Sequence, residues 1–179
     1  MIPVSGYGVV MSTARTDLVL VTGLAPGLTD QATTPLLDRP GTVAVHHDVS
    51  RLDSGVAVRT LRESGPQGVT THTAAIELAH GCLSCTLRLD LLPLLRTLGR
   101  RDDVHRVVLQ LDPALEPEHL CWSIEHVALD HAPAGVPETA GDHVRVAGVL
   151  AVLDAATWFD ARPATSASPT SGSRPPPTT

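Results

Sequence analysis

The chain has 179 residues, of which 42% are hydrophobic and only 2% aromatic, so it can bury one substantial aliphatic core. Its net charge of −6 and the lack of a basic stripe argue against a nucleic-acid partner, and no apolar run reaches membrane-spanning length. Three cysteines, without an export signal in the first residues, favour a reducing, cytoplasmic location. All thirteen basic residues are arginine, and there is no lysine or asparagine, so chemistry that needs either residue is excluded.

Apolar strand-like segments alternate with helix-sized segments along the chain. Residues 1–15 are weakly patterned and are treated as an extension. Strands are predicted over residues 17–22, 42–46, 69–79, 104–111 and 144–153. Helices are predicted over residues 29–37, 50–63, 90–98 (with Asp90 as N-cap) and 117–129. This alternation predicts an α/β domain over residues 16–160, with a parallel sheet and helices on both faces, followed by a disordered Pro/Ser/Thr-rich tail over residues 161–179.

Two cysteines stand three residues apart between a predicted strand and a predicted helix. Cys82 and Cys85 can chelate a soft cation or form a redox disulfide, and as small residues they can also simply pack at a strand end. Two thiolates are fewer than the three or four ligands that zinc takes, so a metal site needs additional ligands. His80 is the nearest candidate, and residues 46–48 (His-His-Asp) are either a second source or a solvated strand end.

A helix further along the chain offers a weaker candidate. Residues 117–129 carry His119, Cys121, Glu125 and His126, and the spacing of Cys121 and Glu125 places them on one helix face. Such a pair can ligate a metal, but packing of Cys121 in the core beside a surface Glu125 is the favoured interpretation.

The order and spacing of these segments over about residues 17–158 resemble the N-terminal part of the CobW-type GTPases, a metallochaperone family related to HypB and UreG. Residues 81–92 are similar to the family's G-C-x-C-C-[S/T] metal motif and its continuation, with Ser84 in place of the middle cysteine. Residues 21–37 correspond to the P-loop, residues 109–117 to the Walker B region and residues 152–156 to a V-D-A segment. The resemblance implies a P-loop-NTPase-like, incomplete fold.

The resemblance also implies which residues would contact a nucleotide, namely Gly23, Gly27, Thr29 and Asp154. A P-loop needs backbone N–H groups and a lysine to hold the phosphates, but this chain has no lysine. The alternative for residues 23–29 is an ordinary glycine turn between strand and helix.

Three departures fall on the nucleotide motifs. Pro26 removes one N–H donor from the P-loop-like turn, Gln110 replaces the Walker B acid, and Pro113 replaces the family's glycine. The family hydrolyses GTP with Mg²⁺, and we expect weak or lost GTP binding and no hydrolysis here.

The sequence therefore predicts a transition-metal protein, with zinc bound through Cys82, Cys85 and His80 and a client metalloprotein as partner. The alternatives are a non-catalytic protein-interaction module or an inert fragment of a CobW-type protein. The sequence leaves open whether the chain forms a homodimer.

Overall fold

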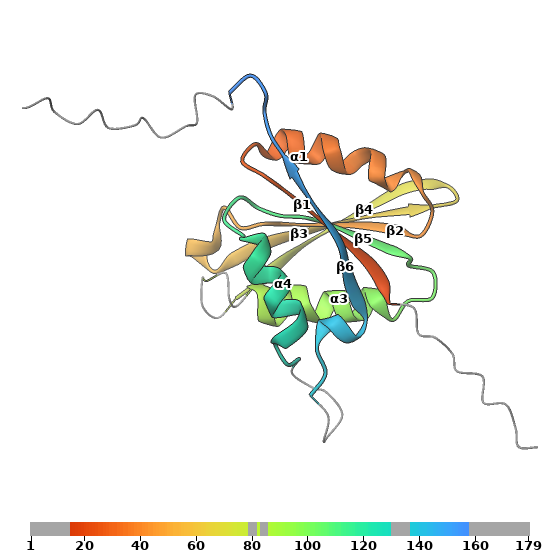
Figure 1. The fold of residues 1–179 in the computed structure, drawn as a ribbon. Coiled ribbons are helices and arrows are strands. Elements are labelled where there is room, and N and C mark those ends of the chain that lie inside the picture. The colour runs from red at the N-terminus through yellow and green to blue at the C-terminus, as the bar shows by residue number, and fades with distance from the viewer. Residues whose placement is uncertain (1–14, 79–81, 83–85, 130–136, 158–179) are drawn as a thin grey trace, which may run out of the picture.

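The computed structural model describes residues 15–78, 82, 86–129 and 137–157. It contains one six-stranded sheet in the order β4-β3-β2-β5-β1-β6 (Figure 1). The strands are β1 (Thr16–Gly23), β2 (Thr42–Asp48), β3 (Val56–Gly65), β4 (Gly68–Glu77), β5 (Arg106–Gln110) and β6 (Val144–Val152). The α-helices are α1 (Pro26–Thr33), α3 (Leu92–Gly99) and α4 (Pro117–His126). Short 3₁₀ turns, η1 (Thr34–Asp38), η2 (Leu52–Ser54) and η4 (Ala140–Asp142), and a π-helical turn η3 (Leu87–Leu91) complete the described elements.

The predicted α/β class is confirmed, and helices lie on both faces of the sheet, with α1 on one side and α3 and α4 on the other (Figure 1). The prediction of a wholly parallel sheet is wrong. Strands β2, β5, β1 and β6 are parallel, whereas β3 is antiparallel to both β2 and β4. A meander of three strands is therefore joined to a parallel half.

The predicted helix over residues 50–63 is the cause of that error. Its first part forms only the single turn η2, which ends at Gly55 with a φ of 73°. A left-handed glycine is a common helix stop, and the following Val-Ala-Val-Arg-Thr-Leu-Arg run has the β-branched, alternating character of a strand. Residues 56–65 are therefore strand β3.

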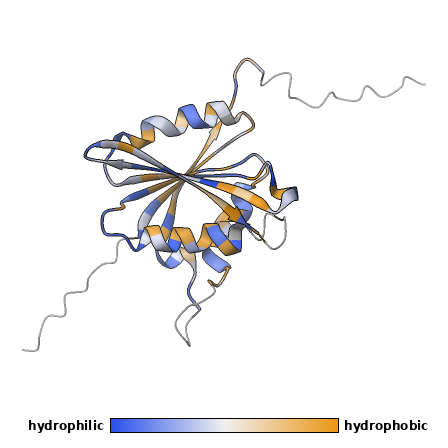
Figure 2. Cartoon of the chain, turned by 180° about the vertical axis from the view of Figure 1, so that it is seen from behind, coloured by the Kyte–Doolittle hydropathy of each residue, from blue (hydrophilic) through white to orange (hydrophobic). Residues whose placement is uncertain are grey.

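Side-chain alternation along the strands divides the core into two apolar layers. On the face that α3 and α4 cover, Leu18, Leu20, Val43, Val45, Val107 and Leu109 pack against helix leucines such as Leu92, Leu95 and Leu98. On the α1 face, the smaller layer consists of Val21, Leu37, Ala44 and Val108. Each fully buried leucine or valine contributes about 1.5–3 kcal/mol of transfer free energy. The hydropathy colouring shows hydrophilic and hydrophobic residues along both the strands and the helices (Figure 2).

The helix after the cysteine segment begins earlier than predicted. The π-helical turn Leu87–Leu91 precedes α3, so Asp90 lies inside the helical segment and is not its N-cap. Pro93 lies in the first turn of α3, as predicted. No helix among the described residues is both long enough and apolar enough to cross a membrane.

Candidate functional site

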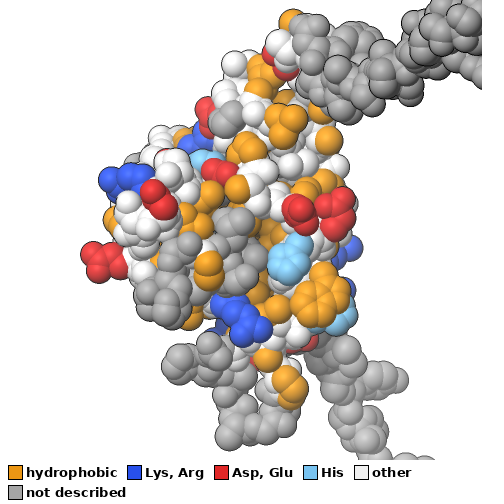
Figure 3. Space-filling view, turned by 90° about the vertical axis from the view of Figure 1, so that its left-hand side faces the viewer, with side chains coloured by type: hydrophobic (Ala, Val, Ile, Leu, Met, Phe, Trp, Pro, Cys, Tyr) orange, Lys and Arg blue, Asp and Glu red, His pale blue; other side chains and the backbone are white. Residues whose placement is uncertain are grey.

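The carboxyl ends of the parallel strands meet at one edge of the sheet, at the left of Figure 1, and this edge faces the viewer in Figure 3. Strand β4 also ends there, because it is antiparallel to β3, which is itself antiparallel to β2. The topology thus brings to one edge the turn after β1, the histidines at the end of β2 and the segment after β4. In open α/β sheets, ligands bind outside this end of the strands. Apolar, acidic and histidine side chains are interspersed over it (Figure 3).

The turn after β1 is shorter than a phosphate-binding loop. Only Leu24 and Ala25 separate Gly23, the last residue of β1, from the start of α1 at Pro26. A Cβ atom on Gly23 would lie 2.6 Å from the Val152 carbonyl oxygen, whereas a Cβ on Gly27 would enter open space. Gly23 is therefore needed for packing against β6, and Gly27 is an exposed residue of the first helical turn.

At the start of α1, one backbone donor is missing and another is engaged within the chain. The N–H groups of Leu28 and Thr29 both donate to the Ala25 carbonyl, at 3.0 and 3.1 Å. Pro26 has no N–H at all. A phosphate-binding helix N-terminus presents its free N–H groups to the ligand, and here Pro26 and Leu28 offer none, while the Thr29 bond is the ordinary first bond of the helix.

The Thr29 side chain is also engaged within the protein. Its residue is only 1% exposed, and its hydroxyl accepts a hydrogen bond of 3.2 Å from the Gln110 amide at the end of β5. In a G-K-[S/T] sequence the lysine stands between the glycine and the hydroxyl residue, and Leu28 occupies that place. Thr29 and Gln110, which stand where the resemblance would place two Mg²⁺ ligands, thus form a neutral, buried contact with each other.

The predicted metal ligands lie partly outside the described residues. His80 and Cys85 fall in the undescribed ranges, while Cys82 is described and exposed. The Cys82 carbonyl accepts the Thr86 N–H at 3.3 Å, which places Cys82 one turn before the helical segment. Within the described part of the chain, no three His, Cys, Asp or Glu side chains form a metal-holding group.

A buried polar cluster lies on the helical segment that follows the cysteines. Asp90, on η3, accepts hydrogen bonds from His47 Nε2 on β2 and from Arg59 Nη1 on β3, both at 2.5 Å. His47 is 1% exposed, and its Nδ1 atom is buried with no hydrogen-bond partner among the described residues. The cluster joins β2, β3 and η3. Charged groups are costly to bury, and they need hydrogen-bonded partners of opposite charge such as these.

Sequence reasoning found only part of this cluster. His47 was among the candidate ligands, but Asp90 was predicted as a helix cap and Arg59 lay in a predicted helix. The available signal was an acidic residue inside a leucine-rich run, since such a residue is costly to bury and needs a partner. Its partners come from strands more than thirty residues away in sequence, which the local pattern does not show.

The remaining candidate residues from the sequence lie apart from one another and outside this cluster. Asp154 lies just after β6, and its carboxylate accepts the Ala156 N–H at 2.9 Å, so it shapes a turn. His46 points to the other face of β2 from His47, and its Nδ1 lies 3.2 Å from the Gln110 carbonyl oxygen. Cys121 packs against the core, and burial, reinforced by Glu118, raises the pKa of its thiol. Cys121 therefore has the packing role that the sequence favoured.

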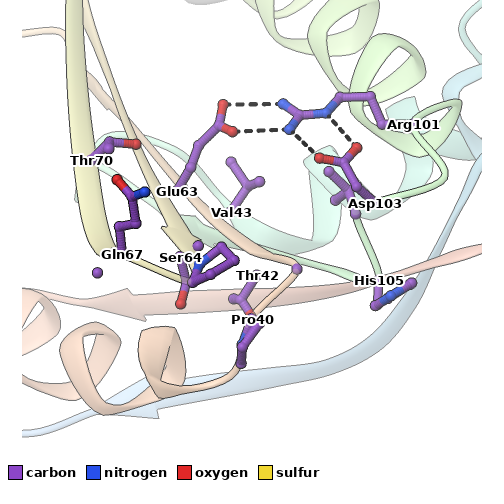
Figure 4. A pocket seen from close by; sticks show the side chains of 15 residues that line it. Pro40, Thr42, Val43, Glu63, Ser64, Gln67, Thr70, Arg101, Asp103 and His105 are labelled. Atoms are coloured by element: carbon purple, nitrogen blue, oxygen red, sulfur yellow. Dashed lines mark hydrogen bonds and ion pairs between the residues drawn. The ribbon is translucent and has the colours of Figure 1, made fainter.

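A cavity of about 570 Å³ lies at the opposite edge of the sheet, between the β3–β4 turn and the loop before β5 (Figure 4). Its charged side chains satisfy one another: the Arg101 guanidinium donates to both carboxylate oxygens of Glu63 and to Asp103. The Arg101 bonds hold the pKa of Asp103 below its usual range. This edge carries a closed ion-pair network, far from the strand ends that gather the candidate residues.

Fold and site together define an α/β protein with a buried His47–Asp90–Arg59 cluster and an exposed cysteine, Cys82, at the carboxyl ends of its parallel strands. The chain is similar to the "Zinc chaperone Rv0106" of Mycobacterium tuberculosis and to the "Uncharacterized protein Mb0109" of Mycobacterium bovis, at 43% identity over 145 residues in each case. The matched region is 81% of this chain and 35% of each relative, so the chain spans about a third of the length of these proteins. No family model and no solved structure matches the chain.

Proposed function

We propose that the chain is a zinc-binding domain of metallochaperone type, in which Cys82 and Cys85 supply thiolates and His80 a third ligand. The observation that carries the proposal is the exposed position of Cys82 at the ligand-binding edge of the sheet, one turn ahead of a helix. The similarity to a relative named as a zinc chaperone supports it.

Three protein ligands suit transfer better than permanent storage. Closed structural zinc sites use four ligands, while sites that exchange a ligand keep one position open. A chaperone has to release its metal to a client metalloprotein, and the open position is where a client ligand would enter.

The buried cluster of His47, Arg59 and Asp90 gives the site a rigid base. Cys85 lies five residues before Asp90 in the sequence, and Asp90 is tied to two strands. The helical end of the metal segment is therefore held, and reorganisation on metal binding would be confined to the residues before Thr86.

The proposal includes weak or lost GTP binding on a P-loop-derived fold. Four observations support this part: the short turn after β1, the loss of two N–H donors at Pro26 and Leu28, the Thr29–Gln110 contact and the absence of lysine. Without residues that bind the phosphates, nucleotide binding cannot drive metal release. Transfer would then depend on the zinc affinity of the client relative to that of this chain.

The metal site is tested by competitive zinc titration of the chain and of Cys82→Ser, Cys85→Ser and His80→Ala. Each loss of a direct ligand should lower zinc affinity by more than the roughly 10- to 100-fold that loss of an outer partner causes. Affinity should also fall in acid, because protons compete for every ligand. Cys121→Ser is the matched control and should bind zinc as the parent chain does; equal affinity in all variants would refute the site.

The nucleotide part is tested separately by titration with GTP and Mg²⁺ and by a phosphate-release assay. We expect neither saturable binding in the micromolar range nor turnover above background. Tight GTP binding or GTP turnover would overturn this part. The zinc proposal would still stand, because the residues proposed to bind zinc are different from those of the nucleotide motifs.

A further inference from the structure

One polar atom of the buried cluster has no partner. His47 Nε2 lies 2.5 Å from one carboxylate oxygen of Asp90, and the other oxygen accepts a hydrogen bond from Arg59. The second ring nitrogen of His47, Nδ1, is buried and unpartnered in the described part of the chain. Because the side chain is only 1% exposed, a donor on a neighbouring surface cannot reach this atom, whereas a water molecule or a metal ion is small enough to do so.

The Asp90 carboxylate determines which nitrogen of the ring carries the proton. Asp90 pairs as a carboxylate with the Arg59 guanidinium, and a carboxylate only accepts hydrogen bonds. In the neutral imidazole of His47 the proton is therefore on Nε2, and Nδ1 has a lone pair. Metal-ligating histidines almost always donate their other N–H in this way, because the acceptor fixes the tautomer and the orientation of the ring.

A buried water is a poor partner for Nδ1. His47 lies on the same face of β2 as Val45, which belongs to the larger apolar layer. A buried water needs two to four polar partners, and the apolar side chains of that layer offer none. A zinc ion needs an imidazole nitrogen together with ligands such as thiolates.

The helical segment that holds Asp90 leads back to Cys82. The Thr86 N–H donates to the Cys82 carbonyl, and Thr86 and Asp90 are both buried, so Cys82 lies about two turns, roughly 12 Å, from Asp90. This separation is shorter than the path from Cys82 through a zinc ion, the imidazole and the Asp90 carboxylate. Asp90 also lies in the π-helical turn η3, and such turns are frequent at functional sites.

We propose that His47 Nδ1 takes the fourth position at the zinc ion held by Cys82, and that a client ligand later enters at this position. The inference rests on the proposed function and adds to it a ligand from β2. Asp90 keeps its bond to Nε2 throughout, so the imidazole returns to the described arrangement when a client ligand displaces it. Exchange then begins at one neutral nitrogen and leaves the charged thiolates bound.

Competitive titration with zinc chloride compares the parent chain with variants of two adjacent histidines. His47→Gln should lower zinc affinity by at least about tenfold, because an amide retains a donor for Asp90 but has no nitrogen lone pair. His46→Gln is the matched control, since His46 faces the other side of β2 and its Nδ1 lies 3.2 Å from the Gln110 carbonyl oxygen. It should bind zinc as the parent chain does. Equal affinity in His47→Gln and the parent chain would overturn the proposal.

X-ray absorption at the zinc edge separates a ligand from a histidine that only stabilises the fold. An imidazole ligand is recognised by its nitrogen at about 2.0–2.1 Å from zinc and by the ring carbons beyond it, which a water ligand lacks. At saturating zinc, His47→Gln should show one imidazole ring fewer than the parent chain. Weaker binding with an unchanged number of rings would assign His47 to the fold alone and would also overturn the proposal.

A measurement on the parent chain covers the case in which His47→Gln does not fold. In a chain with ¹⁵N-labelled histidine, zinc should move the Nδ1 resonance of His47 and leave its Nε2 proton in place, and an unchanged Nδ1 resonance would refute the inference. Loss of zinc binding in Cys82→Ser without any effect of His47→Gln would remove only His47 from the site. A parent chain that binds no zinc would refute this inference and the proposed function together.

Discussion

The turn after β1 and the buried cluster of His47, Arg59 and Asp90 lie at the same edge of one sheet but contain polar groups of opposite kinds. In the turn, the Thr29 hydroxyl and the Gln110 amide form a neutral contact, and the helix donors bond to Ala25. In the cluster, Asp90 gathers an arginine and a histidine inside the larger apolar layer. One region has a neutral buried contact and the other retains ionisable groups.

This difference between the turn and the cluster indicates which of the two regions contributes more electrostatic stability to the fold. A neutral hydrogen bond contributes only about 1 kcal/mol net, whereas breaking a buried ion pair strands an uncompensated charge. The cluster should therefore dominate stability, and the turn should tolerate change except where its backbone is crowded. Substitutions in the two regions test this contrast.

Asp90→Asn should have the largest effect, a loss of about 3 kcal/mol in the free energy of unfolding, because it leaves Arg59 and His47 without their anion. Urea denaturation measures it. Asp30→Asn is the matched control: Asp30 pairs with Arg62 at 2.9 Å but is more than half exposed, so its loss should cost less than about 1 kcal/mol. Equal losses would remove the distinction between the two regions.

Gly23→Ala should cost about 2 kcal/mol, because the new methyl group would lie 2.6 Å from the Val152 carbonyl oxygen and 2.9 Å from Thr29 Cγ2. Gly27→Ala, four residues on, meets open space inside a helix and should leave stability unchanged or raise it by up to about 1 kcal/mol. Thermal melting of the two variants compares them directly. A tolerated Gly23→Ala would mean that β1 and β6 can separate at this point.

Thr29→Val should cost about 1 kcal/mol, because the isosteric side chain leaves the buried Gln110 amide without its hydroxyl acceptor. Thr34→Val, on the exposed side of the same segment, should change little. Urea denaturation distinguishes the two. A loss as large as that of Asp90→Asn would show that the turn is as demanding as the cluster.

The smallest effect is expected for Asp48, which follows His47 on β2 but lies in water. Hydrogen bonds from Ser50 hold the pKa of Asp48 below its usual value of 3.8. The folded state therefore favours the carboxylate, so this contribution is full above the unfolded pKa and is lost as the pH falls through the folded pKa. Asp48→Asn should flatten the acid limb of stability against pH slightly, and an unchanged limb would contradict the assignment.

Much of the fold was predictable because four of its strands contain apolar runs. The segments at residues 17–22, 42–46 and 144–153 all became strands, since aliphatic runs of this length favour buried parallel strands. The β3 strand was missed because Ser50 to Gly55 begins like a helix, and the positive φ of Gly55, which ends it, is a tertiary outcome. That one error also hid the antiparallel half of the sheet.

Sequence patterns indicate candidate site residues that stand close together along the chain. They do not indicate contacts between residues that are far apart in sequence. Cys82 is a candidate ligand from its motif and is exposed, and its role as a ligand stays a prediction. The Thr29–Gln110 and His47–Asp90 contacts join residues 81 and 43 positions apart, so no pattern along the chain shows them. His80 and Cys85 lie outside the described residues and remain predictions.

The strand order also sets when the sheet can form. Both neighbours of β1 come late in the chain, β5 at residues 106–110 and β6 at residues 144–152, whereas β2, β3 and β4 are consecutive and adjacent. During synthesis the meander can close as soon as residue 77 emerges, but β1 has no strand partner until residues 106–110 have been made. Closing such long loops is entropically costly and slows folding. The apolar first strand therefore stays without a strand partner for longer than the strands of the meander do.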